Sequence, residues 1–376
     1  LLQKMLLPAV IGLAMTGSPR AETGVSDGQI IVGQSITLQG GANAYGSAAS
    51  FGSKLYIDRV NAAGGVHGRR IVLRILDDDN SSATAEANAR KLVADGAFLL
   101  FGSVEGAPSV AVMKVAEALK VPFFGPMAGS PALRSPPQPL VFPVRAEHKE
   151  EFRALMLWGK RTGLASVGFM FSDSEVGQSH LANVNRLTDE LGMQLALTLP
   201  LDADVSDAEI DAMVQKIAEA RPDMIFNHGS AGVYQRLITK ARAAGLSTHF
   251  MAVNSGSSQL AQALGPLAHG MVFAQVVPNP NDRKYPIVRE FQDALEKAGR
   301  SEELSYGALE GFMTAKAMVM ALDAAGPALT RNGFVSRLEA SRFDLGGVSV
   351  RYAPADHEGS RFVDLSIVAR DGRFVQ

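Results

Sequence analysis

The sequence predicts an α/β protein made of two doubly wound parallel sheets, and three observations support this fold class. The chain has 376 residues, which exceeds the usual size of one hydrophobic core. From Gln29 onward, short apolar segments alternate with longer amphipathic ones, as in a parallel sheet with crossover helices. The alternation restarts after Phe142-Pro143-Val144-Arg145. We therefore expect two similar α/β units in succession.

The first unit is expected to hold four strands joined by three helices. The strands are Ile30–Ser35, Ile71–Leu76, Ala97–Phe101 and Val121–Gly125, and the helices are Ala48–Ala62, Ser82–Ala94 and Pro108–Leu119. The prediction of the first helix rests on apolar residues at helical spacing, which are Phe51, Leu55, Tyr56, Ile57 and Val60. Gly64-Gly65 then ends that helix.

The second unit repeats the pattern without the fixed short period of a solenoid. Its expected helices are Phe152–Thr162, His180–Leu191, Asp207–Ala220 and Val233–Ala244, and its strands are Ser166–Phe171, Gln194–Leu199, Met224–Asn227 and His249–Val253. Each helix is long enough to cross back between two parallel strands.

The last hundred residues are expected to return to the first unit. Long helical patterns occur at Tyr285–Ala298 and Tyr306–Ala324, without strands of their own. Gly347–Tyr352 and Val363–Ala369 are expected to pair as a hairpin, with His357 in an exposed turn between them. We therefore assign residues 27–145 and 278–345 to lobe 1 and residues 146–277 and 346–376 to lobe 2. Several crossings between the lobes would form a hinge.

The N-terminal segment has the features of a secretory signal. Lys4 precedes an apolar run from Met5 to Met15, and small residues follow up to Ala21. A buried first helix is the alternative, which Pro8 and Gly12 disfavour. We expect residues 1–21 to be cleaved and the mature protein to be soluble and exported to the periplasm.

Composition argues against several classes of function. The formal net charge is -2, which does not favour a nucleic-acid partner. The chain has no cysteine, so disulfides, thiolate metal sites and thiol nucleophiles are excluded. The histidines lack H-E-x-x-H spacing, and Asp77-Asp78-Asp79 is attributed to a turn at a strand end. We therefore expect no cofactor, no metal and no catalysis.

Several short stretches, in their order and spacing, resemble the leucine/isoleucine/valine-binding family of periplasmic receptors. They are Ala44-Tyr45-Gly46, the run from Asn61 to Arg69, Asp77-Asp78, Gly125-Pro126, the run from Lys240 to Leu246, and Phe250-Met251. The resemblance covers about residues 27–374. It implies the type I periplasmic binding fold, two lobes joined by three crossovers, and a monomer that binds a small molecule and delivers it to a membrane ABC permease without chemistry.

Two turns in the first lobe, Gly102–Pro108 and Gly125–Pro131, are candidate ligand contacts. They follow predicted strands, and parallel sheets bind ligands beyond the carboxyl ends of their strands. Simple helix capping, at Pro108 and at Ser130, is the alternative for both turns. The resemblance places an amino acid against them and Tyr45 over it. The candidate residues there are Tyr45, Val104, Glu105, Gly106, Met127, Ala128, Gly129 and Ser130.

The second lobe departs from the family. The matching positions are Val176, Ser230 and Asn254, where amino-acid-binding members present aromatics at the first two and a carboxylate at the third. A buried ammonium needs a counter-charge, which Asn254 does not supply. Glu105 could restore the charge, or it could hydrogen-bond Asn80 where relatives have a disulfide. An amino acid, another small carboxylate and an amide therefore remain open as ligands, and transport and ligand sensing as roles.

Overall fold

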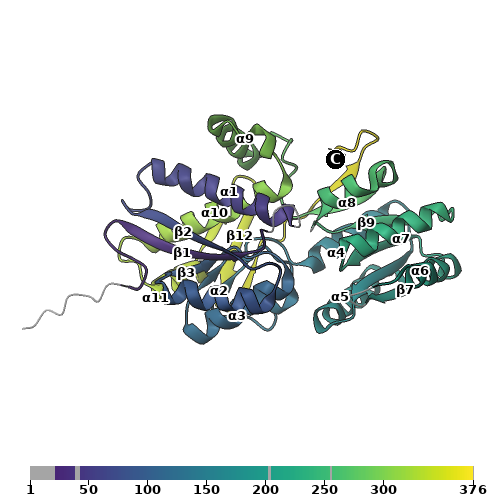
Figure 1. Cartoon of the computed structure of the whole chain (residues 1–376), viewed down its shortest axis with the longest axis horizontal. Coiled ribbons are helices and arrows are strands. Elements are labelled where there is room, and N and C mark those ends of the chain that lie inside the picture. Colours follow the sequence, from purple (N-terminus) through teal and green to yellow (C-terminus); the bar gives the residue numbers. More distant parts are fainter. Residues whose placement is uncertain (1–21, 39–42, 202–204, 255, 376) are drawn as a thin grey trace, which may run out of the picture.

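Two α/β units lie side by side along the long axis of the molecule (Figure 1). This computed structural model describes residues 22–38, 43–201, 205–254 and 256–375. The expected signal at residues 1–21 lies outside them. Among the described helices, none combines the length and hydrophobicity needed to cross a membrane.

The first unit contains a five-stranded parallel sheet in the order β2-β1-β3-β4-β5. Its strands are β1 Gln29–Ile36, β2 Arg70–Asp77, β3 Leu99–Phe101, β4 Phe123–Phe124 and β5 Val141–Phe142. Between them lie α1 Ala44–Ala62, α2 Ser82–Ala94, α3 Gly106–Leu119 and the short η2 Pro131–Leu133. α2 and α3 cover one face of the sheet, and α1 lies on the other face with α10, Tyr306–Ala325 (Figure 1).

Small residues allow α1 and α10 to pack closely. A Cβ atom on Gly52 would lie 1.8 Å from the carbonyl oxygen of Ala308, and one on Gly311 would lie 1.9 Å from that of Ala49. Any side chain at either glycine would force the helices apart. This contact fixes the first half of α1 against the first turns of α10, where two site residues described below are found.

The second unit contains a seven-stranded sheet in the order β15-β14-β10-β9-β8-β6-β7. Its strands are β6 Ser166–Ser172, β7 Gln194–Leu201, β8 Met224–His228, β9 His249–Ala252, β10 Val272–Gln275, β14 Asp364–Val368 and β15 Phe374–Val375. Its helices are α4 His148–Arg161, α5 Glu175–Leu191, α6 Asp207–Ala220, α7 Ala231–Ala243, α8 Ser257–Leu264 and the short η3 Gly265–Ala268. The strands from β10 to β7 are parallel, and β14 and β15 extend the sheet antiparallel.

The chain crosses between the units three times, at residues 143–147, 276–285 and 360–363. After the second crossing it returns to the first unit, as expected. The returning elements are α9 Pro286–Ala298, η4 Ser301–Glu303, α10, α11 Arg331–Glu339, β11 Arg342–Asp344, β12 Ser349–Ala353 and β13 Asp356–Gly359. Three crossings give the predicted hinge.

The predicted C-terminal hairpin is wrong. β12 pairs with β11 and β13 in a separate antiparallel sheet, whereas β14 pairs with β10 of the second unit. Val350 and Tyr352 of β12 are buried in the core of the first unit, so the assignment of this segment to lobe 2 is also corrected. His357 is 4% exposed and contacts the carbonyl oxygens of Gln138 and Val141, so it does not lie in an exposed turn.

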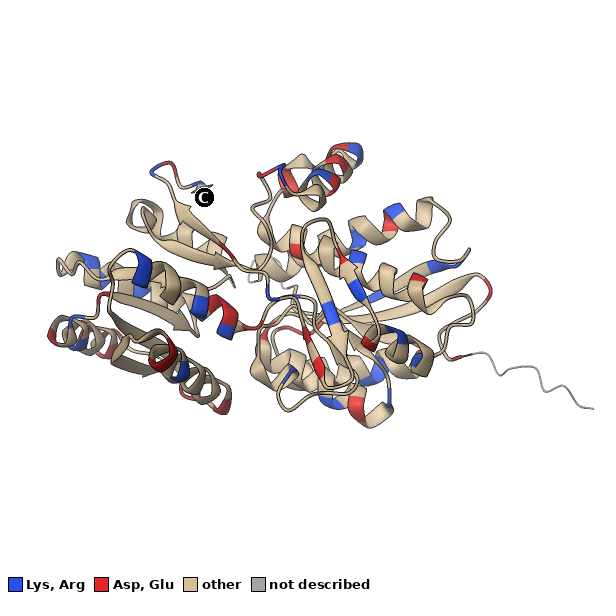
Figure 2. Ribbon diagram, turned by 180° about the vertical axis from the view of Figure 1, so that it is seen from behind, with Lys and Arg blue, Asp and Glu red and all other residues tan. Residues whose placement is uncertain are grey.

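Charged residues of both signs are distributed over both units (Figure 2). They occur mainly on the outer helices and turns, in keeping with the formal net charge of -2. No single-sign face is visible in this view that would favour a polyanionic partner.

Candidate functional site

A cavity of about 170 Å³ lies between the two units, beyond the carboxyl ends of the parallel strands of both sheets. Its lining residues are Tyr45, Glu105, Gly106, Met127, Ala128, Gly129, Ser130, His148, Val176, Asn227, His228, Gly229, Ala231, Ala252, Val253 and Leu260. Both units contribute a wall. The cavity is smaller than pockets for drug-sized ligands, so it suits a small molecule.

The wall of the first unit contains most of the residues predicted from the sequence. Seven of its candidates line the cavity, and the eighth, Val104, is fully buried behind it and forms a parallel β-bridge with Met127. That bridge joins the two predicted turns, so they form one continuous surface. Ser130 is 2% exposed, and its hydroxyl has no hydrogen-bond partner within the described structure. It is therefore free to bond a ligand.

Arg134 holds the second turn in place from behind. Its guanidinium donates to the carbonyl oxygens of Ala128 at 3.2 Å, Ser130 at 3.1 Å and Arg145 at 3.0 Å. Burial lowers the pKa of Arg134 to about 10, against an opposing effect of Glu147. The side chain thus remains a cation at neutral pH, and it places a positive charge behind the cavity wall.

Glu105 has a partner that the sequence did not indicate. Its carboxylate accepts a hydrogen bond from the side-chain amide of Asn43 at 3.1 Å. No bond joins Glu105 to Asn80 in the described part of the chain, so the predicted replacement for a disulfide is not formed. Asn43 also caps α1 by accepting from the amide of Gly46 at 2.8 Å. Glu105 is therefore tied to the start of α1 at the edge of the cavity.

On the wall of the second unit, the three predicted residues have different surroundings. Val176 lines the cavity. Ser230 does not: its hydroxyl accepts from the amide of Val233 at 3.3 Å and caps α7, and it borders a neighbouring hollow with Glu105. Asn254 is 1% exposed and lies behind Tyr45, to whose hydroxyl it donates at 3.3 Å.

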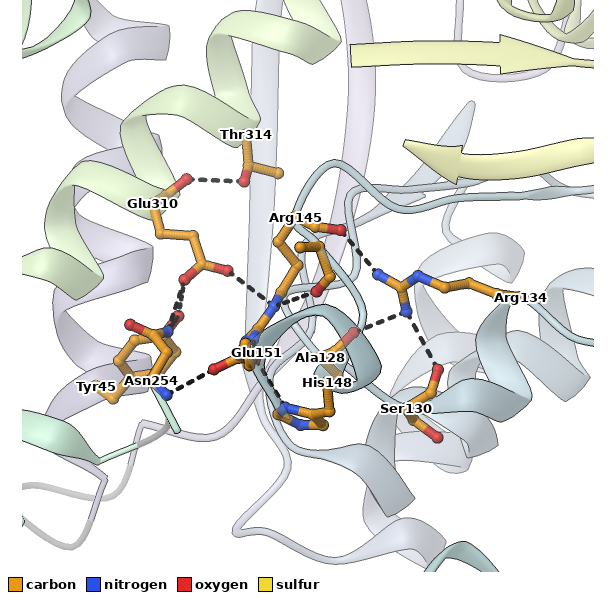
Figure 3. A network of polar contacts seen from close by, with 11 residues as sticks. Tyr45, Ala128, Ser130, Arg134, Arg145, His148, Glu151, Asn254, Glu310 and Thr314 are labelled. Atoms are coloured by element: carbon orange, nitrogen blue, oxygen red, sulfur yellow. Dashed lines mark hydrogen bonds and ion pairs between the residues drawn. The ribbon is translucent and has the colours of Figure 1, made fainter. Parts of the chain in front are cut away.

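Five side chains form a buried polar network at the hinge (Figure 3). We call Tyr45, Arg145, Glu151, Asn254 and Glu310 the hinge network. Tyr45 donates to Glu310, and Arg145 donates to Glu151. The backbone amide of Asn254 donates to Glu151 at 2.7 Å, and its side chain donates to Glu310 at 3.3 Å. The network therefore joins α1 and α10 of the first unit to the second unit through the first crossing.

The charges of this network are balanced by pairing. Burial by itself would raise the pKa of Glu151, but Arg145 and His148 lower it below its ordinary value. Burial raises the pKa of Glu310, although Arg145 and Tyr45 oppose the shift. Glu151 is thus the carboxylate that stays ionised beside Arg145. Buried pairs of this kind are costly to break because the remaining charge stays in a poorly solvated site.

The sequence analysis missed three histidines beside the cavity. We call His148, His180 and His228 the histidine cluster. His148 begins α4, His180 lies in α5, and His228 ends β8. The ring centroids of His180 and His228 are 3.8 Å apart, and those of His148 and His228 are 4.7 Å apart. Their positions in the sequence are 32 or more residues apart, so no spacing rule could have grouped them.

Comparisons with known proteins agree with this architecture. A family model described as periplasmic binding protein matches residues 29–373. A curated relative, Leu/Ile/Val-binding protein homolog 8 from Brucella suis, is 22% identical over 395 residues, covering 100% of this chain and 96% of the relative.

Two solved structures share the fold. One is a branched chain amino acid ABC transporter protein from Thermus thermophilus with bound valine, with a TM-score of 0.79 and 19% identity over 93% of this chain and 95% of the other. The other is a fatty acid ABC transporter substrate-binding protein from Thermomonospora curvata, with a TM-score of 0.80 and 20% identity over 95% of this chain and 94% of the other.

The match of the family model covers nearly all of the described chain, and the two-unit fold with an intervening cavity is the arrangement predicted from the resemblance. Members of this family bind ligands and do not transform them. The chain therefore belongs to the periplasmic binding protein family.

Proposed function

We propose that this protein is the periplasmic substrate-binding component of an ABC transporter, and that it captures an amino acid or a related small carboxylate in the cavity between its lobes. The observation that carries the proposal is a small cavity walled by both lobes and connected to a three-crossover hinge. Closure of such a hinge buries a ligand, and the closed form is then recognised by a permease. The protein acts as a monomer.

The walls support a ligand with an acidic group on the first lobe. Ser130 offers a free hydroxyl, and Arg134 lies directly behind the same turn. Burial strengthens the attraction between such a cation and a carboxylate because the local dielectric constant is low. The proposed contacts on this lobe are Tyr45, Glu105, Gly106 and the turn from Met127 to Ser130.

The residues of the second lobe do not restrict the ligand to branched-chain amino acids. Val176 is the proposed contact there, with Asn254 acting through Tyr45. Valine is named for one neighbour in fold and a fatty acid for another. A sensory role, in which the closed form reports the ligand to a membrane receptor, is the second candidate, because it would use the same cavity and hinge.

Native mass spectrometry of the mature protein, followed by identification of any released molecule, tests the proposal. A panel of amino acids, small carboxylates and amides in thermal-shift and calorimetric titrations provides the second measurement. We expect one small acid per chain. Tyr45→Ala should weaken ligand binding and, because it also removes a hydrogen bond of the hinge network, should lower stability while the protein still folds. A protein to which no member of the panel binds, and which releases nothing, would contradict the proposal.

Removing the charge of Glu105 would distinguish an amino-acid ligand from the other small acids. Glu105→Gln should weaken amino acids selectively if the carboxylate contacts an ammonium group. If Glu105 only holds Asn43, the variant should lose thermal stability with no change in ligand preference. Transport and sensing are then distinguished by reconstitution with the permease, which only the transport role requires.

A further inference from the structure

The histidine cluster forms part of the cavity wall on the second lobe. His148 and His228 line the cavity, and His180 lies behind them with 0% of its surface exposed. The aromatic ring of Phe152 packs against His148 and His180, with centroids 6.1 Å and 5.5 Å away. The imidazoles therefore lie between an aromatic core and the ligand space.

Three ring nitrogens of this cluster have no partner within the described structure. Neither ring nitrogen of His180 has a hydrogen bond in the described structure, nor does Nδ1 of His228. Nδ1 of His148 lies 2.8 Å from Oε1 of Glu151. An unpartnered buried polar group costs about 1–3 kcal/mol. Such a cost is expected where the missing partner is a ligand rather than another part of the fold.

The charged side chains around the cluster do not supply partners for the unpaired nitrogens of His180 and His228. From the elements packed against it, the acidic groups are Glu105 across the cavity, Glu147 and Glu151, and the basic groups are Arg134 and Arg145. Each acid is already engaged: Glu105 by Asn43, Glu147 by Lys149 and Asn183, and Glu151 by Arg145. Arg134, in contrast, has no ion pair among the described residues, and it contacts only carbonyl oxygens.

Because the nearby acids are already engaged and Arg134 has no ion pair among the described residues, these surroundings favour an anion over an ammonium group. A neutral imidazole donates one hydrogen bond and accepts one, whereas a protonated imidazole donates two. We propose that the histidine cluster receives an acidic group of the ligand, a carboxylate, and that the cluster takes up a proton as the ligand binds. This inference rests on the proposed function, and it narrows the ligand to a small organic acid whose anionic group lies between the first-lobe turn at Ser130 and the histidine cluster. The two adjoin, because the amide of His148 donates to the carbonyl oxygen of Gly129 at 3.1 Å.

The direction of the proton linkage follows from the surroundings of the free cluster. Burial, and then His228 and His148, lower the pKa of His180 well below its ordinary value. Burial, and then the nearby His148, do the same for His228. Both rings are therefore neutral in the empty protein at neutral pH. A bound carboxylate favours the charged form and raises the pKa, so affinity must increase as pH falls.

Acetate is a direct test of the proposed carboxylate site, because it carries the anionic group alone and is small enough for the cavity. Imidazole NMR signals of the full chain would be followed during titration with acetate, with methylammonium and acetamide as cationic and neutral controls. We expect acetate alone to shift the signals of His228 and raise its pKa. Between the lower pKa of the free protein and the raised pKa of the complex, acetate affinity should weaken about tenfold per pH unit for one linked proton, and it should level off at higher pH. Unmoved signals, a preference for methylammonium or pH-independent binding would each overturn the proposal.

A matched pair of variants tests the assignment of His228 to the carboxylate site. His228→Gln keeps a hydrogen-bonding side chain but cannot be protonated, and it should weaken acetate binding about tenfold or more and abolish the pH dependence. His269→Gln, at an exposed position of the same lobe, should leave both unchanged. Equal acetate affinity in the two variants would contradict the proposal, and if His228→Gln fails to fold, the titration of the unaltered protein decides.

The outcome also separates this inference from the proposed function. If amino acids bind in the ligand panel but acetate does not perturb the histidines, the transport function stands and the anion site fails. If acetate binds with the expected pH dependence but no amino acid of the panel binds, the anion site stands and the amino-acid part of the proposed ligand class fails.

Discussion

The hinge network and the histidine cluster lie side by side, yet they differ in how far their polar groups are paired. Every side chain of the hinge network makes at least one hydrogen bond to another member. His180 makes none, and His228 leaves Nδ1 unpaired. His148 joins the two groups through Glu151. Each hinge-network side chain therefore has at least one partner within the network, although Arg145, Asn254 and Glu310 each leave one buried polar atom without a hydrogen bond in the described part of the chain. His180, in contrast, has no hydrogen-bond partner within the described structure.

Because of this difference, we expect the hinge network to affect mainly stability and the histidine cluster to affect mainly ligand binding. Pairing within the hinge network contributes to the folded state and to the relative placement of the lobes. The unpaired imidazoles reduce stability in the empty protein, and ligand contacts can restore that loss as affinity. Substitutions in the two groups should therefore differ in what they change.

The largest effect is expected from Glu151→Gln. This change removes the closer of the two carboxylates beside the buried guanidinium of Arg145 and leaves only Glu310, at 3.9 Å. The free energy of unfolding should fall by about 3 kcal/mol. Denaturant unfolding would measure it. Glu190→Gln, which breaks an exposed pair with Arg153, is the control and should have little effect. Similar losses in both variants would show that the hinge network does not depend on buried pairing.

Arg134→Met should have the next largest effect. It removes three hydrogen bonds to the carbonyl oxygens of the pocket turn and the first crossing while filling a similar volume. We expect a loss of roughly 2–3 kcal/mol in unfolding free energy, together with weaker binding of small acids. Unfolding and calorimetric titration would measure the two effects. Unchanged ligand affinity would confine Arg134 to a structural role.

The pH dependence of stability tests the histidine cluster in the empty protein. The pKa of His180 is lowered in the folded state, so the unfolded state binds its proton more readily as pH falls below the unfolded value. Stability should therefore fall from pH 7 to pH 5, with up to about 1.4 kcal/mol per pH unit arising from this histidine. His180→Phe should flatten the curve of unfolding free energy against pH. A curve unchanged by the substitution would argue against a neutral, buried His180.

The smallest effect is expected from Ser230→Ala. Loss of the α7 cap should cost about 1 kcal/mol in unfolding free energy. Ligand affinity should not change, since Ser230 does not line the cavity. Ser206→Ala, at the capping box of α6, is the matched control far from the lobe interface. A loss of affinity in Ser230→Ala alone would return this residue to the ligand site.

Local patterns in the sequence were sufficient for most elements of the fold. The strand from Ile71 and the helix from Ser82 were predicted to within two residues, because apolar periodicity and capping residues mark them. α8, α11 and β11 were not predicted, since they are short and carry weak periodic signals. The false hairpin arose because period-two alternation predicts a strand but does not specify its partner.

The candidate site also has one part that the sequence predicted and one part that it did not. The two turns of the first lobe could be found because they follow strands and begin helices, positions at which open parallel sheets bind ligands. Arg134, Arg145 and Glu310 carry no local signal, because a buried charge looks like a surface charge in the sequence. Only their burial, at 5% exposure or less, shows that they belong to the site.

The sequence by itself determined the α/β class, the two units, and the two first-lobe turns that line the cavity, because these depend on periodicity and on residues adjacent in the chain. The tertiary structure alone decided the partner of Glu105, the hinge network, and the contact among His148, His180 and His228. These features depend on side chains from different elements meeting in space, and the chirality and packing of the whole fold bring them together.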